Sequence, residues 1–441
     1  MTVSTTSSIA DTLRTTSIAS DSKSDHPPLQ DLSLLLLGTG TSSSLPSIGC
    51  LTNPVSGCWC CRSTLLKDDP KYATEYRKNE RRNISGMLRI PTPPQPGTGR
   101  TERTVLIDCG KSFFSGALEW WPKKGLREID AVLLTHAHAD AILGLDDLRG
   151  WTLRGHIQPS IPIYCTQETY DGVSQAFPYL TNTGKATGGG DIPALEWRVI
   201  DPVAPFDLFG IQVVPLPVEH GKFFTTPPKP FLCSGFLFNR QICYLSDVSS
   251  VPSSVYRTLS HYVDLPTSPS VTGVKENGLE SNGHGEEEGE GEGKKPKLQV
   301  LIVDCLRLEE FTSHYGLGKA VETIRKLGAK RNYLIGFGHR TSHTAWLKAC
   351  ELLSTPNSTS GFGSLTTDAP TFNDLYNGHP DPLQEDPSNF ARRALQVVEN
   401  WEKARGANWG KGERPWVRPS CDGMTITVGR DGRTTGDDEY Q

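Results

Sequence analysis

The chain has 441 residues, of which 36% are hydrophobic and 22% are charged, and it contains 43 glycines and 32 prolines. Its formal net charge is −5, but six glutamates between residues 280 and 292 carry more than this charge, so the remainder is nearly neutral. Such a balance excludes the strongly basic surface that nucleic acids or anionic membranes would attract.

Residues 1–30 are rich in serine and threonine and lack hydrophobic periodicity, which predicts a disordered tail. The segment has no basic start followed by an apolar stretch, so we do not expect secretion. No later apolar run approaches the roughly 18 residues that cross a bilayer. We therefore expect a cytoplasmic protein and leave a nuclear or organellar location open.

Short apolar runs bounded by glycine or polar residues follow the tail, as in sheet strands that are covered on both faces. They predict strands at residues 32–37, 104–108, 129–134, 161–165, 211–215, 236–245 and 298–303. Helical spacing is present at residues 318–327 and 344–353. Strands interleaved with helices predict one α/β layered domain over residues 31–353.

Two stretches interrupt this pattern. Residues 265–297 are rich in serine, glycine and glutamate and predict a disordered insertion within the domain. Residues 354–413 are irregular at first and then helical around 387–405, which indicates a second insertion. Residues 414–441 are expected to supply a final strand at 424–428 and a tail.

A histidine-rich motif directly follows the predicted strand at 129–134. His136 and His138 lie two positions apart, so both side chains should point to one side of the strand end, and Asp140 follows two residues later. Two imidazoles and a carboxylate form a ligand set that zinc favours. A pair of structural histidines is the alternative interpretation, and the added Asp140 makes it the weaker one.

The motif Thr135-His-Ala-His-Ala-Asp140, followed by Gly144-Leu-Asp-Asp-Leu-Arg149, resembles the metallo-β-lactamase superfamily. The resemblance is strongest to the branch that contains the bacterial phosphonate-pathway cyclic-phosphate phosphodiesterase and its plant and fungal relatives. It extends discontinuously over residues 32–345 and 415–428. It implies a four-layer αββα sandwich in which metals lie at one edge of two sheets.

The resemblance also implies the remaining ligands of the catalytic centre. A first metal would bind His136, His138, His220 and the bridging Asp247, and a second would bind Asp140, Asp247 and His339. Most relatives have another histidine where this chain has Ala141, so we expect the second metal to bind more weakly. One or two Zn²⁺ ions are expected in this centre, with Mn²⁺ as an alternative.

Four cysteines crowd between residues 50 and 61. Cys58 and Cys61 form a Cys-x2-Cys pair with Cys50 upstream, a spacing typical of closed structural zinc sites, whereas unligated loop thiols are the alternative. The branch that the chain resembles often adds a histidine shortly after the last catalytic histidine. His343 is expected in that role, and Cys60 is a spare.

Asp140 and His314 are the expected catalytic residues. His314 matches a non-ligand histidine of the same branch, where it donates a proton or holds a substrate phosphate, although a helix-capping role is an equal alternative. The resemblance implies attack on phosphorus or a carbonyl carbon by a metal-bound hydroxide.

The expected function is hydrolysis of a small, and in the related enzymes cyclic, phosphate ester by a metal-dependent phosphodiesterase. The expected partner is this small molecule, with no nucleic acid and no membrane, and the oligomeric state stays open. Thioester hydrolysis and RNA 3′-end processing are the enzyme alternatives, because fold and ligands are shared across these reactions. A non-catalytic zinc-binding protein is the rival from another class, and Ala141 is the feature that favours it.

Overall fold

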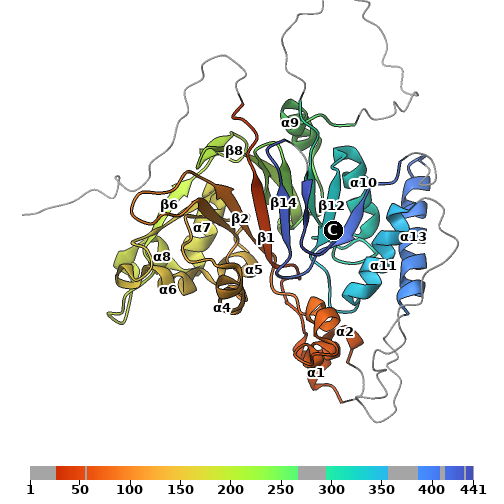
Figure 1. Ribbon diagram of the computed structural model, residues 1–441, viewed down its shortest axis with the longest axis horizontal. Coiled ribbons are helices and arrows are strands. Elements are labelled where there is room, and N and C mark those ends of the chain that lie inside the picture. Colours follow the sequence, from red (N-terminus) through yellow and green to blue (C-terminus); the bar gives the residue numbers. More distant parts are fainter. Residues whose placement is uncertain are drawn as a thin grey trace, which may run out of the picture.

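Two β-sheets pack face to face, and helices cover the outer face of each, in a computed structural model that describes residues 26–54, 57–266, 295–355, 386–407, 413–431 and 434–440 (Figure 1). In spatial order the first sheet contains β15 (Thr434–Asp437), β14 (Thr425–Val428), β1 (Leu32–Gly38), β2 (Ser85–Pro91), β3 (Glu102–Ile107), β4 (Ala131–Leu133), β5 (Ile161–Cys165) and β6 (Leu195–Val199). The second contains β13 (Val417–Pro419), β12 (Arg331–Ile335), β11 (Val300–Asp304), β10 (Ile242–Leu245), β9 (Pro230–Phe238), β8 (Ile211–Lys222) and β7 (Phe206–Leu208). The expected four-layer αββα sandwich is confirmed.

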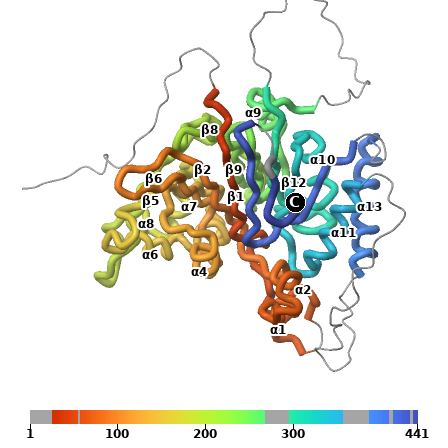
Figure 2. Tube along the Cα trace, in the orientation of Figure 1, coloured from red at the N-terminus to blue at the C-terminus, as the bar shows by residue number. Residues whose placement is uncertain are grey.

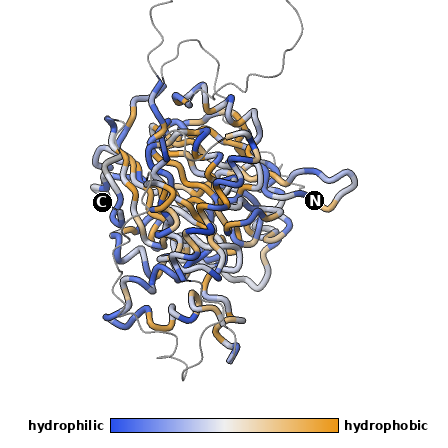
Figure 3. Tube along the Cα trace, turned by 90° about the vertical axis from the view of Figure 1, so that its right-hand side faces the viewer, coloured by the Kyte–Doolittle hydropathy of each residue, from blue (hydrophilic) through white to orange (hydrophobic). Residues whose placement is uncertain are grey.

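Strand β1 shows how the sequence builds these layers. Alternate side chains of a strand point to opposite faces, and here Leu34 and Leu36 pack between the sheets while Leu35 and Leu37 pack against helices. Both faces of β1 therefore need apolar side chains, and the strand accordingly contains four consecutive leucines. Hydrophobic residues are concentrated in the same central region of the fold (Figure 3).

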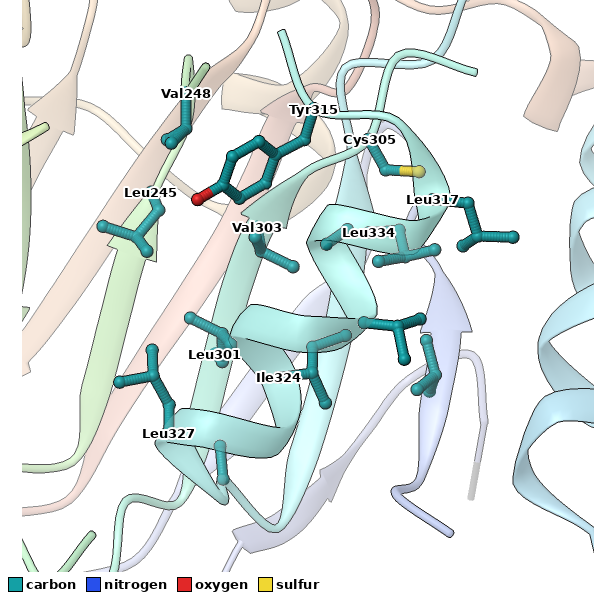
Figure 4. Close-up of a cluster of buried hydrophobic side chains, with 14 of the residues drawn as sticks. Leu245, Val248, Leu301, Val303, Cys305, Tyr315, Leu317, Ile324, Leu327 and Leu334 are labelled. Carbon is teal, nitrogen blue, oxygen red and sulfur yellow. The ribbon is translucent and has the colours of Figure 1, made fainter. Parts of the chain in front are cut away.

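Helices form the outer layers. Those against the first sheet include α4 (Phe113–Lys124), α5 (Ala139–Ile142) and α7 (Gln167–Ala176), and those against the second include α9 (Ser253–Tyr262), α10 (Leu317–Leu327) and α11 (His343–Ser354). Helix α13 (Pro387–Lys403) packs on α10 and α11 from outside (Figure 1). On α10, Leu317, Ile324 and Leu327 share one face and lie against Leu301 and Leu334 of the sheet (Figure 4). This spacing is the period of an amphipathic helix on a sheet.

The remaining helical segments are short. They are α1 (Ile48–Thr52), α2 (Trp59–Ser63), η2 (Thr64–Leu66), α3 (Ala73–Tyr76), η3 (Arg77–Asn79), η4 (Leu145–Leu148), α6 (Arg149–Thr152), η5 (Leu153–Gly155), α8 (Pro178–Thr181) and η6 (Thr183–Lys185). Helices α1 and α2 form a small projection beside the sandwich (Figures 1 and 2). None of the helices in the described part of the chain combines the length and hydrophobicity that a membrane crossing requires.

Two predicted strands are wrong in extent. The strand expected at residues 211–215 continues to Lys222 as β8. Residues 236–245, expected as a single strand, belong to two antiparallel strands, β9 and β10, which pair as a hairpin. The turn between them contains Asn239 and Arg240, whose φ angles are 47° and 59°. Asparagine tolerates this left-handed conformation better than most residues, and the tight turn is too short to interrupt the apolar pattern. The predicted tail up to residue 25 and most of both predicted insertions (267–294, 356–385 and 408–412) lie outside the described residues.

The candidate site lies where strands of both sheets end. Strands β3 and β4 are parallel neighbours in the first sheet, and β10, β11 and β12 are parallel neighbours in the second. Polar residues lie at or just after their carboxyl ends, namely Asp108, Thr135, Asp247, Asp304 and His339. Ligand sites of layered α/β proteins form at such strand ends.

Candidate metal centre

Three histidines meet at the end of β4 and in β8. One ring nitrogen from each of His136, His138 and His220 lies within 4.8 Å of the other two. Nε2 of His220 and Nδ1 of His138 are 3.2 Å apart. His136 and His220 are buried, whereas His138 is exposed, so the group has one face open to solvent.

Hydrogen bonds fix which nitrogen of each buried histidine faces the group. Asp108 accepts both the N–H and the O–H of Thr135 at 2.8 Å, so the Thr135 hydroxyl oxygen is left to accept the Nδ1–H of His136, also at 2.8 Å. Nε2 of His136 then carries no proton, and this buried atom has no hydrogen-bond partner among the described residues. His220 likewise directs Nδ1 to the carbonyl of Ser313 at 2.7 Å and turns Nε2 inward. Backbone or carboxylate partners fix metal-binding imidazoles in this way.

These donors fit a divalent metal ion. Two nitrogens bound at 2.0–2.1 Å in a tetrahedral arrangement would lie about 3.4 Å apart, close to the 3.2 Å between His220 and His138. Burial lowers the pKa of His136 to about 3, so its imidazole is neutral. Neutral imidazole is the form that binds metals, and an ion would provide the missing partner of the buried Nε2.

Two carboxylates border the histidines. Asp247 lies within 4.8 Å of donor atoms of His136 and His220. Burial alone would raise the pKa of Asp247, but the imidazoles of His136, His220 and His314 bring it below its usual range. Asp140 has an oxygen 3.8 Å from Nε2 of His136, and burial together with the charge of Asp247 raises the pKa of Asp140.

The loop after β3 approaches the motif at Gly110. A Cβ atom on Gly110 would lie 1.7 Å from the carbonyl oxygen of Asp140, so only glycine fits. A backbone hydrogen bond joins the two segments, because Cys109 donates its N–H to the carbonyl of Ala141 at 2.8 Å. Asp140 is thereby fixed against the strand end that carries Asp108.

His314 lies on the other side of the centre and has its own carboxylate. Nδ1 of His314 donates to Asp304 at 2.8 Å and is 4.0 Å from Asp247. Burial lowers the pKa of His314, but the charge and hydrogen bond of Asp304 and the charge of Asp247 outweigh it and raise this pKa to about 9. The ring of His314 is therefore a cation at neutral pH, 4.9 Å from the ring of His220.

A second group consists of three thiols and one imidazole. The sulfurs of Cys50, Cys58 and Cys61 lie 3.4, 3.5 and 3.7 Å from Nδ1 of His339. Tetrahedral zinc with its usual bond lengths would place sulfur and nitrogen about 3.6 Å apart. The backbone N–H of Ser47 points at the sulfur of Cys61 at 3.1 Å, which suits a thiolate. These four residues therefore fit a closed zinc site.

The fourth member of this group differs from the sequence expectation. His343, expected there, is the first residue of α11, and its Nε2 faces the hydroxyl of Tyr440 at 2.9 Å. His339, expected in the catalytic centre, points to the thiols instead, and Cys60 contacts the carbonyl of Thr341. The two histidines are four residues apart, and only the turn that leads into α11 decides which of them faces the cysteines.

The second catalytic metal thereby loses a ligand. The structure leaves it Asp140 and the shared Asp247, because His339 is directed elsewhere. The side chain of Ala141 is buried within the apolar cluster under α4 and α5. The donors expected for the first metal ion therefore lie together, whereas the donors expected for the second metal ion do not.

The sequence interpretation assigned no role in the site to three residues around the centre: Asp108, Thr135 and Asp304. A signal for two of them exists, because Val105-Leu-Ile-Asp108 and Leu301-Ile-Val-Asp304 each end an apolar strand on a carboxylate, as Tyr244-Leu-Ser-Asp247 does. A carboxylate at a strand end is common as a cap or turn residue, so the pattern alone does not separate them from ordinary strand ends.

Comparison with known proteins finds one matching family model and several similar proteins. The family model of the β-lactamase superfamily domain matches residues 103–270. The chain is 25% identical over 306 residues to an octanoyltransferase of Porphyromonas gingivalis; the alignment covers 69% of this chain but only 46% of that protein. A diphosphatase of the PhnP family has 26% identity and a TM-score of 0.48, with 71% of this chain and 89% of that chain covered. Unliganded yeast PDE1 has 11% identity and a TM-score of 0.46, with 90% and 99% covered.

Proposed function

We propose that this chain, which carries a β-lactamase superfamily domain and the metallo-β-lactamase fold of a hydrolase, is a metal-dependent phosphodiesterase acting on a small phosphate ester. One observation carries the proposal. Three imidazoles and Asp247 converge beside His314, whose pKa is raised by Asp304. This combination offers both a metal-binding group and a proton donor.

The histidine group would hold the metal through Nε2 of His136, Nδ1 of His138 and Nε2 of His220, with Asp247 as the fourth donor. A divalent ion bound there would supply a Lewis acid for the phosphoryl group and a water molecule of lowered pKa. Asp140, whose pKa is raised and which is fixed beside His136, would orient the attacking water by accepting a hydrogen bond. We propose zinc as the ion, with Mn²⁺ as the alternative.

His314 would act on the leaving group. Its Nδ1 is held by Asp304, so Nε2 is the nitrogen left to donate a proton to the departing ester oxygen or to bind a phosphoryl oxygen. An alkoxide leaving group needs such a proton because it is strongly basic. A thiolate needs it far less, so a buried cationic donor favours an oxygen ester of phosphate over a thioester.

The same geometry supports one tightly bound ion in this centre and a second in the cysteine group. Asp140 and Asp247 alone are too few protein ligands for a stable catalytic zinc, which takes three. We therefore expect about two metal ions per chain.

A direct assay separates the proposal from its alternatives. The purified protein would be given bis(p-nitrophenyl) phosphate and a p-nitrothiophenyl acyl ester while its metal content is measured. Metal-dependent release from the diester supports the proposal. Release from the thioester alone would replace the phosphodiesterase proposal with acyl chemistry, the kind of reaction that the name of the similar octanoyltransferase suggests. A metal-loaded protein that turns over neither compound would favour a non-catalytic zinc-binding role.

A further inference from the structure

Phenylalanine rings flank the histidine group at both ends. The ring of Phe231 is stacked on that of His138, with centroids 4.4 Å apart and planes inclined by 10°. The ring of Phe311 lies over His314 at 6.4 Å and 23°. Between them His138 and His220 are 5.0 Å apart, and His220 and His314 are 4.9 Å apart. Aromatic side chains therefore border the opening of the site on two sides.

A hairpin extends this aromatic border into solvent. Strand β8 ends at Lys222 and β9 begins at Pro230, and the N–H of Phe223 donates to the carbonyl of Lys229 at 2.8 Å. We call residues 222–230 the flap. The ring of Phe223 packs edge-on against Phe231 at 5.3 Å, which joins the flap to the histidine group.

The phenylalanine side chains around the opening are more exposed to solvent than is usual for apolar side chains. Phe223 is 41% exposed, Phe224 is fully exposed, and Phe311 on the opposite side is 48% exposed. An exposed phenylalanine forgoes the burial that normally stabilises it, and apolar side chains gathered on a surface commonly mark a binding site. Lys222 and Lys229, at the two ends of the flap, are exposed as well.

We propose that the flap, with Phe231 and Phe311, binds the organic group of the substrate and selects phosphodiesters that carry a flat aromatic ring of the nucleobase type. This inference rests on the proposed function, because it assigns the substrate class of the same site. Aromatic faces take flat rings by stacking. Lysine cations beside them suit the negative charge of a phosphodiester, which an uncharged acyl ester lacks.

Two chemically matched substrates test the inference. Thymidine 5′-(p-nitrophenyl phosphate) and methyl p-nitrophenyl phosphate release the same leaving group and differ only in the other ester group. We expect kcat/KM to be about tenfold or more higher for the thymidine ester, mainly through a lower KM. Equal values, or a higher value for a long-chain alkyl ester of the same leaving group, would overturn the inference.

Single substitutions test which residues produce the preference for the thymidine ester. Phe223→Leu and Phe311→Leu keep an apolar side chain but remove the aromatic face, so the ratio of the two kcat/KM values should fall toward one. Phe224→Ser should lower the ratio too. Leu118→Ser, which removes a 65% exposed apolar side chain from α4, is the matched control and should leave the ratio unchanged. An unchanged ratio in all three phenylalanine variants would contradict the role of the flap.

Binding measurements separate this inference from the proposed function. Calorimetry with thymidine 5′-monophosphate and ribose 5-phosphate should give tighter binding of the nucleotide, and the difference should shrink in Phe223→Leu. If that result is found while no diester is hydrolysed, the flap binds nucleotides as proposed, but the phosphodiesterase proposal fails and the selection of a phosphodiester substrate fails with it. If the flap variants instead abolish binding to phosphatidylserine vesicles and leave nucleotide binding unchanged, the flap is a membrane contact and the inference is wrong.

Discussion

The two candidate metal sites of this chain are built in opposite ways: the histidine group lies at strand ends of the sandwich, whereas the cysteine group joins the projection of α1 and α2 to the segment after β12. The cysteine group has four donors whose spacing closes a tetrahedron, and all three of its thiols are buried. The histidine group has an exposed member, His138, and carboxylates on two sides. A metal whose positions are all filled can only stabilise the fold, whereas one with an open face can also meet a substrate. The comparison therefore predicts that damage to one site costs stability and damage to the other costs activity.

The strongest test is His138→Ala. The exposed ligand would be lost from the open site, so kcat/KM for the diester should fall about a thousandfold or more, because the ion supplies several kcal/mol to the transition state. The melting temperature should change little, since an exposed side chain contributes little packing. Activity near the wild-type value in metal-free buffer would show that the histidine group is not the catalytic site.

The closed site is tested by Cys58→Ser beside Cys60→Ser. The first change removes a proposed zinc ligand and should lower the free energy of unfolding by about 2 kcal/mol or more, because metal binding there is coupled to folding. Metal content should fall by about one ion per chain. Cys60 is equally buried but lies outside the group, so its substitution should spare the metal. Equal metal loss in both variants would argue against the assigned ligands.

A smaller effect is expected from Thr135→Val, which keeps the shape of the side chain and removes its hydroxyl. His136 would lose the acceptor that fixes its ring, and metal affinity of the open site should weaken about 10–100-fold. Competition with a chromophoric chelator measures this change. Thr152→Val, at a buried threonine in α6, is the control. Unaltered affinity in Thr135→Val would mean that the ring needs no such support.

The smallest effect concerns pH. With its pKa at about 9, His314 is protonated at neutral pH and loses its proton as the pH rises, so kcat should decline through that range if His314 donates a proton. Asp304→Asn removes the charge that raises this pKa and should move the decline to lower pH by about one unit. A pH profile of kcat for both proteins, measured with a diester whose leaving group is an alkoxide, checks the shift. A profile that stays flat above pH 9 in the wild type would exclude His314 as the donor.

The fold could be predicted further from the sequence than the site. Apolar runs such as the leucines of β1 predict strands that are covered on both faces. His136, His138 and Asp140 are so close in the sequence that their spacing alone predicts a common site. The assignment of His339 and His343 could not be made by spacing, because it depends on the turn before α11. Asp304 was missed because its contact with His314 crosses a loop whose path the sequence does not reveal.

The matched family model covers the two sites unequally. The matched residues 103–270 include the histidine group, while the cysteine group and the Asp304–His314 pair lie outside them. The residues of the open site thus lie within the matched family model, whereas the ligands of the closed site lie outside it. Measuring the metal content of Cys58→Ser and Cys60→Ser is therefore the more informative experiment for the cysteine group.

The order of strands in the first sheet has a consequence for how the chain folds. Strand β1 lies between β2 and β14, and Leu32 is paired with Val428. One side of the first strand is therefore completed only when residues almost 400 positions later have been synthesised. Contacts between such distant segments slow folding, and unpaired strand edges favour aggregation until they are covered. We expect a chain that ends before β14 to accumulate as aggregates, whatever the state of its two metal sites.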